Sequence, residues 1–316
     1  MSKQIIIIIP THNRQAYIKY VVKYYSLFPC KVYICDSSKQ KADVVNTGNV
    51  IYRWIPDTNF YDKILQILDE TTADYYALSP DDDYLKEETL LECFNALSNN
   101  DVYSLGIGKQ ILFREKVYNQ FYSFKGANQL EHIANFEFKN SNDYINYFWK
   151  NYQNILWSVF RKDVLDNAFK CLSKCNFDNG NFIELILGIE SLRAGHVYAS
   201  NNGLNYREVI DGEHWGNTTP SISYKNIEKY HELYNDVQKF KSYYQCDNQF
   251  ALYSLNSYLN AEIRSVPFIS KMMKYVPLSI KNYIKRSFKR NNNIPSKSDP
   301  FVDIDMSKKI SLARKN

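Results

Sequence analysis

The sequence has no apolar run long enough to cross a membrane and no secretion signal. Its apolar start, Ile5 to Ile9, has five residues and runs directly into Pro10. A membrane-spanning helix needs about 20 apolar residues, and a signal peptide needs a longer apolar core followed by a small-residue cleavage site. The sequence alone therefore predicts a protein of the cytoplasm.

Several catalytic and metal-binding motifs are missing as well. There is no P-loop, no Gly-x-Ser-x-Gly and no His-Glu-x-x-His, which disfavours the enzyme classes built on them. The six cysteines form no Cys-x-x-Cys pair and no Cys/His zinc spacing, so buried free thiols in a reducing compartment are expected. Gly106 and Gly108 lack the third glycine of a dinucleotide-binding fingerprint and are expected at a strand end.

The composition is that of a globular protein. Hydrophobic residues make up 45% of the 316 residues, enough to bury a core. The net charge of +5 is too small to indicate a nucleic-acid partner, and none is expected. Aromatic residues reach 16%; this excess has two readings, sugar-binding surfaces or the codon bias of an AT-rich genome.

Over the first hundred residues, strand-like runs alternate with helical patterns. The runs are Ile5–Ile9, Lys31–Cys35, Val50–Trp54, Asp74–Leu78 and Val102–Leu105. Between them, apolar residues recur at helical spacing at 18–25, 61–68 and 90–97. This order predicts an α/β fold with a mostly parallel sheet and helices on its faces.

The remainder of the chain divides by composition. Residues 182–194 form a helical pattern that ends at Gly195, and residues 223–264 are helical and polar. We therefore expect three units: a catalytic α/β domain at 1–215, a helical extension at 216–265 and a basic amphipathic, partly disordered tail at 266–316.

The tail is strongly basic. Between residues 263 and 298 there are nine Lys or Arg and no Asp or Glu, and beyond Asn291 no periodicity remains. Such a segment can lie in an anionic membrane interface, so peripheral association with the cytoplasmic face of the inner membrane is expected. The alternative is a helix packed on the catalytic domain with a solvated basic face.

Polar clusters follow three of the predicted strands: 10–14 (Pro-Thr-His-Asn-Arg), 36–38 (Asp-Ser-Ser) and 81–83 (three Asp). Ligands bind at the carboxyl ends of the strands in a parallel α/β sheet. Three adjacent carboxylates repel one another unless a cation or a helix N-terminus neutralises them. A Mn²⁺ or Mg²⁺ ion on Asp81, Asp82 and Asp83, together with a diphosphate, is one reading; an N-terminal cap for the helix that begins near Lys86 is the other.

These segments resemble family 2 glycosyltransferases of the GT-A fold. The likeness rests on Ile-Pro-Thr-His-Asn-Arg at 9–14, Cys-Asp-Ser-Ser at 35–38 and Leu-Ser-Pro-Asp-Asp-Asp at 78–83, and covers about residues 4 to 210. The helix at 184–195 is similar to the family's helix that begins with Glu-Asp and ends in Arg-Ala-Gly. The resemblance implies a Rossmann-like fold, a nucleotide-sugar donor and a divalent cation.

The resemblance also assigns donor-site residues. Pro10, Thr11, Asn13 and Arg14 would surround the base and ribose. Asp36 would hydrogen-bond the base, beside Ser37, and Lys63 lies where the family has basic donor contacts. The Asp-x-Asp acids are either Asp81 with Asp83, or Asp82 alone with Pro80 in place of the first acid.

The catalytic position and the closing loop follow from the same resemblance. Counting back from Gly195 places Glu184 at the family's catalytic Asp, with a side chain one methylene longer. Arg207 would neutralise phosphate charge and His214 would contact the diphosphate or the metal. Trp215 would stack on the acceptor sugar, and Trp157 would border its pocket. An ordinary loop or core role is the alternative for each.

The expected function is that of an inverting glycosyltransferase. It would move a sugar from a nucleotide-diphosphate sugar, with UDP as the expected nucleotide, to a hydroxyl of a glycan or lipid-linked acceptor in surface polysaccharide synthesis. Two alternatives remain: a non-catalytic nucleotide-sugar- or glycan-binding protein on the same fold, and a retaining transferase that needs no base at Glu184.

Overall fold

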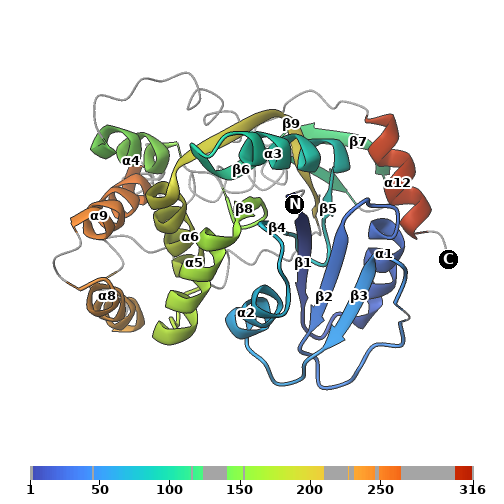
Figure 1. Ribbon diagram of the computed structural model, residues 1–316, viewed down its shortest axis with the longest axis horizontal. Coiled ribbons are helices and arrows are strands. Elements are labelled where there is room, and N and C mark those ends of the chain that lie inside the picture. The colour runs from blue at the N-terminus through green and yellow to red at the C-terminus, as the bar shows by residue number, and fades with distance from the viewer. Residues whose placement is uncertain are drawn as a thin grey trace, which may run out of the picture.

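The computed structural model describes residues 3–44, 46–114, 117–123, 141–151, 154–209, 227, 231–245, 249–264 and 303–314. They build a mixed sheet with the strand order β3-β2-β1-β4-β8-β6-β9-β5, and β7 pairs with β6 beside this path. Helices cover both faces of the sheet (Figure 1). The predicted α/β architecture with flanking helices is confirmed.

The first four strands are parallel. They are β1 (Ile5–Thr11), β2 (Lys31–Asp36), β3 (Val50–Trp54) and β4 (Tyr75–Leu78). All seven residues of β1 are buried, because successive side chains of a strand point to opposite faces and both faces are covered. The continuous apolar run in the sequence thus marks the centre of the sheet.

The second part of the sheet is mixed. It consists of β5 (Tyr84–Leu85), β6 (Tyr103–Arg114), β7 (Val117–Ser123), β8 (Val159–Arg161) and β9 (His196–Val209). Strand β8 runs antiparallel to both β4 and β6, while β6 and β9 are parallel. The long β6 extends well beyond the short strand that the sequence predicted at its start.

Two sets of helices bury the two faces. Helices α1 (Gln15–Tyr25), α3 (Glu87–Asn99) and α12 (Ile304–Arg314) share a core with the odd-numbered residues of β1. The even-numbered residues of β1 pack into the second core. Its helices are α2 (Phe60–Glu70), α4 (Ser141–Lys150), α5 (Lys162–Cys175), α6 (Asn181–Ala194), α8 (His231–Tyr243) and α9 (Gln249–Arg264).

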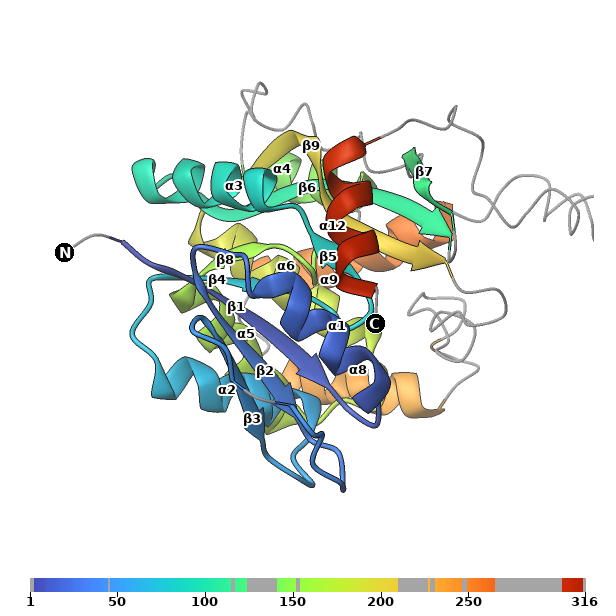
Figure 2. The same ribbon diagram turned by 90° about the vertical axis from the view of Figure 1, so that its right-hand side faces the viewer.

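The C-terminal helix α12 differs from the sequence expectation. No regular structure was expected beyond Asn291, yet residues 304–314 form a helix that lies beside α1 (Figures 1 and 2). Met306, Ile310 and Ala313 are buried on its inner face, at the spacing of an amphipathic helix. The basic segment before α12, residues 265–302, lies outside the described residues.

None of the described helices has the length and apolar character needed to cross a membrane. Five of the cysteines (all except Cys246, which lies outside the described residues) are free thiols; Cys35, Cys93 and Cys171 are buried as the sequence predicted, whereas Cys30 and Cys175 are partly exposed.

Candidate active site

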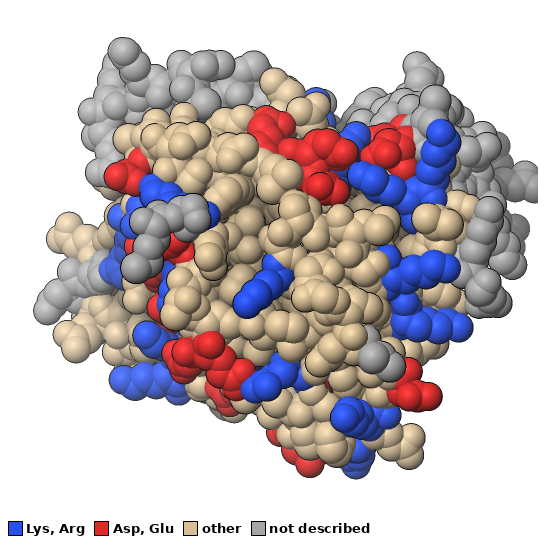
Figure 3. Space-filling view, turned by 45° about the vertical axis from the view of Figure 1, so that its right-hand side comes forward, with Lys and Arg blue, Asp and Glu red and all other residues tan. Residues whose placement is uncertain are grey.

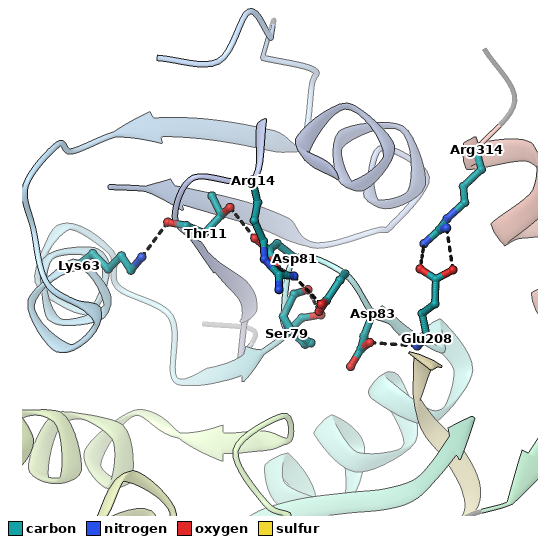
Figure 4. Close-up of polar contacts among 10 residues, drawn as sticks. Thr11, Arg14, Lys63, Ser79, Asp81, Asp83, Glu208 and Arg314 are labelled. Carbon is teal, nitrogen blue, oxygen red and sulfur yellow. Dashed lines mark hydrogen bonds and ion pairs between the residues drawn. The ribbon is translucent and has the colours of Figure 1, made fainter. Parts of the chain in front are cut away.

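The loops after β1 and β4 meet at the carboxyl edge of the sheet. Strands β1 and β4 are neighbours with Ile8 opposite Leu78, so the residues that follow them lie side by side. The hydroxyl of Thr11 donates to Asp81 Oδ2 at 2.5 Å. Arg14 Nη1 donates to Asp81 Oδ1 at 3.2 Å and to Asp82 Oδ2 at 2.5 Å (Figure 4). Two clusters predicted separately thus form one site.

The loop after β2 joins the same edge. The backbone N–H of Ser37 donates to the Thr11 carbonyl at 3.2 Å, and the N–H of Asn13 donates to Ser38 Oγ at 2.7 Å. His12 Nδ1 lies 3.1 Å from Ser37 Oγ. Asn13 has a φ of 56°, a left-handed conformation that asparagine tolerates better than most residues. These contacts fix the turn between β1 and α1.

Lys63 supports this edge from α2. Its ammonium is buried and donates to the Thr11 carbonyl at 2.8 Å and to Ser37 Oγ at 3.1 Å. Burial lowers the pKa of Lys63, although the nearby Cys35, Asp81 and Asp36 favour its charged form. The side chain therefore links the backbone of the first cluster to a hydroxyl of the second beneath the surface.

The side chain of Asp36 also points into the protein interior. Its carboxylate is fully buried and accepts hydrogen bonds from the Ser38 N–H at 2.9 Å, from the Ser38 hydroxyl and from the Tyr52 hydroxyl at 2.6 Å. In this arrangement it organises the loop after β2; its expected contact with a nucleotide base stays a prediction. Pro10, also expected at the donor site, is a buried residue within β1 itself.

The three acidic residues have different surroundings. Burial raises the pKa of Asp81, and the neighbouring Asp82 adds to this, whereas Thr11 and Arg14 oppose it. Burial also raises the pKa of Asp83 well above its usual range. Asp83 turns toward β9, where its Oδ1 accepts the backbone N–H of Glu208 at 3.2 Å (Figure 4). The triplet therefore splits into a pair that shares Arg14 and a third carboxyl on the β9 side.

The pair fits a divalent cation better than the triplet does. An oxygen of Asp81 and an oxygen of Asp82 face the same guanidinium nitrogen of Arg14, so two hard ligands already surround one cationic group. Mg²⁺ commonly takes one or two protein carboxylates together with phosphate oxygens and water. Within the described ranges, no three Asp, Glu, His or Cys side chains form a metal-binding group.

Glu184 is hydrogen-bonded to the segment before β8, and the end of that segment lies beside β4. The Leu78 N–H donates to the Ser158 carbonyl at 3.1 Å, which places Trp157 beside the end of β4. Further back in the same segment, Asn154 Nδ2 donates to Glu184 Oε1 at 2.6 Å. Glu184 lies in the first turn of α6, where the helix dipole favours a negative charge. Trp157 is partly buried and packs against the core.

The other predicted residues fall on or beyond β9. Arg207 lies in β9 opposite Leu112, and its charge partly opposes the burial that raises the pKa of Asp83. His214 and Trp215 lie outside the described residues.

Sequence reasoning missed four side chains that hold site residues, or the neighbours of site residues, in place. They are Ser38, Tyr52, Asn154 and Arg314. Ser38 was visible as part of the polar cluster after β2. The other three contact the site from distant parts of the chain, and no local pattern marks them.

The comparisons with known proteins show the fold. No protein-family model and no curated protein matches the chain. TarS 1–349 of S. aureus in complex with UDP-GlcNAc is similar over 88% of this chain and 77% of that chain, with 12% identity and a TM-score of 0.50. The complex of TarS 1–349 with UDP matches over the same shares, with 13% identity and a TM-score of 0.48.

A longer TarS structure is covered over 46% of its length and 87% of this chain, at 12% identity and a TM-score of 0.47. The chain thus spans about half of that longer protein. The likeness to the UDP-GlcNAc complex shows that the chain has the GT-A-type fold. The expected fold is therefore confirmed, and membership of family 2 stays a prediction.

Proposed function

We propose that the chain is an inverting glycosyltransferase that uses a UDP-sugar and a divalent cation. The observation that carries this proposal is the convergence of Thr11, Arg14, Asp81 and Asp82 at the carboxyl edge of the sheet. Ligands bind at this edge in α/β sheets. The similar fold of TarS, whose structure holds UDP-GlcNAc, adds support for a nucleotide-sugar donor.

In the proposed arrangement, Asp81 and Asp82 hold Mn²⁺ or Mg²⁺, and Arg14 turns to the diphosphate. A bound cation would stabilise the charge that develops on the leaving diphosphate. Arg14 suits the second role because guanidinium groups bind phosphate oxygens in a bidentate manner. Arg207 lies in β9, which pairs with β5 directly after the acidic residues, and adds positive charge near Asp83.

Glu184 is the proposed general base. The acceptor oxygen attacks the anomeric carbon on the face opposite the nucleotide, and the bond to the diphosphate oxygen breaks. The acceptor hydroxyl loses its proton to the carboxylate of Glu184, and the UDP leaves without protonation. The hydrogen bond from Asn154 to Glu184 supports this role, because a general base has to be held in one orientation.

The acceptor class is part of the proposal. A glycan or a lipid-linked glycan fits the partly buried Trp157 beside the end of β4, because the apolar face of a sugar packs well on an aromatic ring. A lipid-linked acceptor would also agree with the basic sequence at 263–298. Surface polysaccharide synthesis is the process in which such acceptors are extended.

The deciding experiment is hydrolysis of a panel of nucleotide sugars with and without Mn²⁺. We expect slow hydrolysis of a UDP-sugar that EDTA abolishes and that the variant Asp82→Asn strongly reduces. Asp69→Asn is a matched control, since Asp69 lies at the end of α2 away from this site. Donor binding without hydrolysis or transfer would instead support the non-catalytic binding protein, and full activity in EDTA would contradict the cation site.

A further inference from the structure

We propose that Arg314, in the C-terminal helix, is a positioning residue for the acidic site and acts through Glu208 and Tyr84 on Asp83. The inference rests on the proposed function and deepens it, because it adds Asp83 to the donor site that the proposal builds on Asp81 and Asp82. The contacts that carry it lie on the side of the site opposite Lys63 (Figure 4).

The first path runs through Glu208. Two guanidinium nitrogens of Arg314 donate to the two carboxylate oxygens of Glu208, at 2.9 and 2.5 Å. Both side chains are largely buried, with 12% of Arg314 and 2% of Glu208 exposed. The backbone N–H of the same Glu208 donates to Asp83 at 3.2 Å. A bidentate pair fixes orientation as well as distance, so Arg314 holds the side chain of the residue whose backbone N–H donates to Asp83.

The second path runs through Tyr84. Arg314 Nε donates to the Tyr84 hydroxyl at 2.9 Å, and its guanidinium carbon lies 5.7 Å from the centre of that ring. Tyr84 directly follows Asp83 in the chain and pairs with β9 opposite Tyr206. One side chain of α12 therefore holds both the residue after Asp83 and the residue that donates to it.

The far end of α12 is anchored separately. Asp303 accepts from Lys86 at 2.7 Å and from Tyr206 at 2.6 Å, and Lys309 pairs with Asp305 and Glu88 on the outer side. Acidic and basic side chains lie next to one another along the upper edge of the face in Figure 3. Because these anchors hold the helix in place, loss of the Arg314 fork can be separated from loss of the helix.

The test compares Arg314→Lys with Lys309→Ala. Lysine keeps the positive charge but lacks the planar fork, so Glu208 and Tyr84 lose their shared donor. Lys309→Ala removes ion pairs from the same helix without touching either path. Thermal unfolding of both variants first measures how much each weakens the docking of α12.

Two measurements then decide the inference. In Arg314→Lys, the amide hydrogen of Glu208 should exchange faster with solvent. The KM for UDP-GlcNAc in Mn²⁺-dependent hydrolysis should rise about tenfold, equivalent to about 1.4 kcal/mol, and kcat should change less. Lys309→Ala should change neither. Equal exchange rates and KM values in the two variants would overturn the positioning role.

A failure of the proposed function would give a different result. If the wild-type protein hydrolyses no nucleotide sugar, the proposed activity is wrong, and the exchange rate of the Glu208 amide alone decides the role of Arg314. Faster exchange of this amide in Arg314→Lys but not in Lys309→Ala supports the positioning role. The same rate in wild type, Arg314→Lys and Lys309→Ala contradicts it.

Discussion

Asn154 donates a hydrogen bond from Nδ2 to Oε1 of Glu184 at 2.6 Å. The two residues lie on different elements, since Asn154 precedes β8 and Glu184 is in the first turn of α6. Asn154 Oδ1 also accepts the backbone N–H of Leu156, so its amide group is oriented from both ends. The side chain of Glu184 is thereby linked to the segment that runs beside the end of β4.

We expect Glu184→Gln to lower kcat at least about 100-fold with little change in KM for the donor, because glutamine keeps the shape and removes the base. The product should have the anomeric configuration opposite to that of the donor, as measured by NMR. Glu190→Gln is a matched control on the same helix, since Glu190 contacts Tyr244 and Arg193 instead. A retained configuration, or near-normal turnover in Glu184→Gln, would support the retaining alternative.

Gly188 lies one helical turn after Glu184 and lets α6 pack closely on α4. A Cβ atom at this position would lie 2.4 Å from Cη2 of Trp149, so either the buried indole or the helix has to move. We expect Gly188→Ala to cost about 1–3 kcal/mol in the free energy of unfolding, measured by urea denaturation, and to reduce kcat as well, because a shift of α6 carries Glu184 with it.

Gly48→Ala is the control for this substitution. A Cβ at Gly48 meets nothing within 4 Å, so the change should leave the stability unchanged or raise it by about 0.4–1 kcal/mol. If both variants were equally stable, the close packing of α6 on Trp149 would not be the reason for glycine at 188.

The strands whose side chains are buried on both faces could be predicted from the sequence. The apolar run Ile5–Ile9 has the length of a buried strand and runs into Pro10, and helices separate β1 from β2 and β3 from β4. Strand β6 was predicted too short because Gly106 and Gly108 read as a strand end. The structure places Gly106 within β6, where a Cβ would lie 2.8 Å from Cβ of Cys93, so glycine reflects close packing of α3.

The candidate site was predictable where its residues follow the strands of the parallel sheet. Thr11, Arg14 and Asp81 could be brought together because adjacent parallel strands end at one edge. Arg314 could not be assigned to the site from the sequence. It contacts Tyr84, which lies 230 residues earlier in the chain, and no local pattern predicts that contact. The apolar spacing of Met306, Ile310 and Ala313 was the available signal for α12. The basic segment before it, with no periodicity beyond Asn291, instead led to the prediction of disorder.

The basic segment can be tested without disturbing α12. Deleting residues 266–316 would also remove Arg314, so we propose to replace Lys281, Lys285, Arg286, Lys289 and Arg290 by Gln. Each basic residue near anionic lipid contributes about 1 kcal/mol. The variant should therefore no longer sediment with anionic vesicles, while Mn²⁺-dependent hydrolysis of soluble donor stays intact. Equal binding of wild type and variant to these vesicles would contradict peripheral membrane association through this segment.

Asp303 makes the docking of α12 dependent on pH. Burial alone would raise its pKa, but hydrogen bonds from Lys86, Tyr206 and the Met306 N–H outweigh burial, so the pKa of Asp303 is lowered. The folded state then binds this proton less tightly than the unfolded state does. The contribution of Asp303 to stability is complete above the ordinary aspartate pKa of about 3.9 and is lost as the pH falls through the lowered value.

We therefore expect Asp303→Asn to reduce the free energy of unfolding by about 1.5–3 kcal/mol at pH 7, the range for hydrogen bonds to a charged group. The difference in the free energy of unfolding between wild type and Asp303→Asn should narrow below about pH 4, where the carboxyl of the unfolded chain takes up its proton. Urea denaturation at decreasing pH measures this difference. Asp305→Asn is the control on the same helix: its side chain is 53% exposed, and an exposed ion pair is worth about 0–1 kcal/mol. A gap for Asp303→Asn that stays constant down to pH 3 would show that its ionised carboxylate does not anchor the helix.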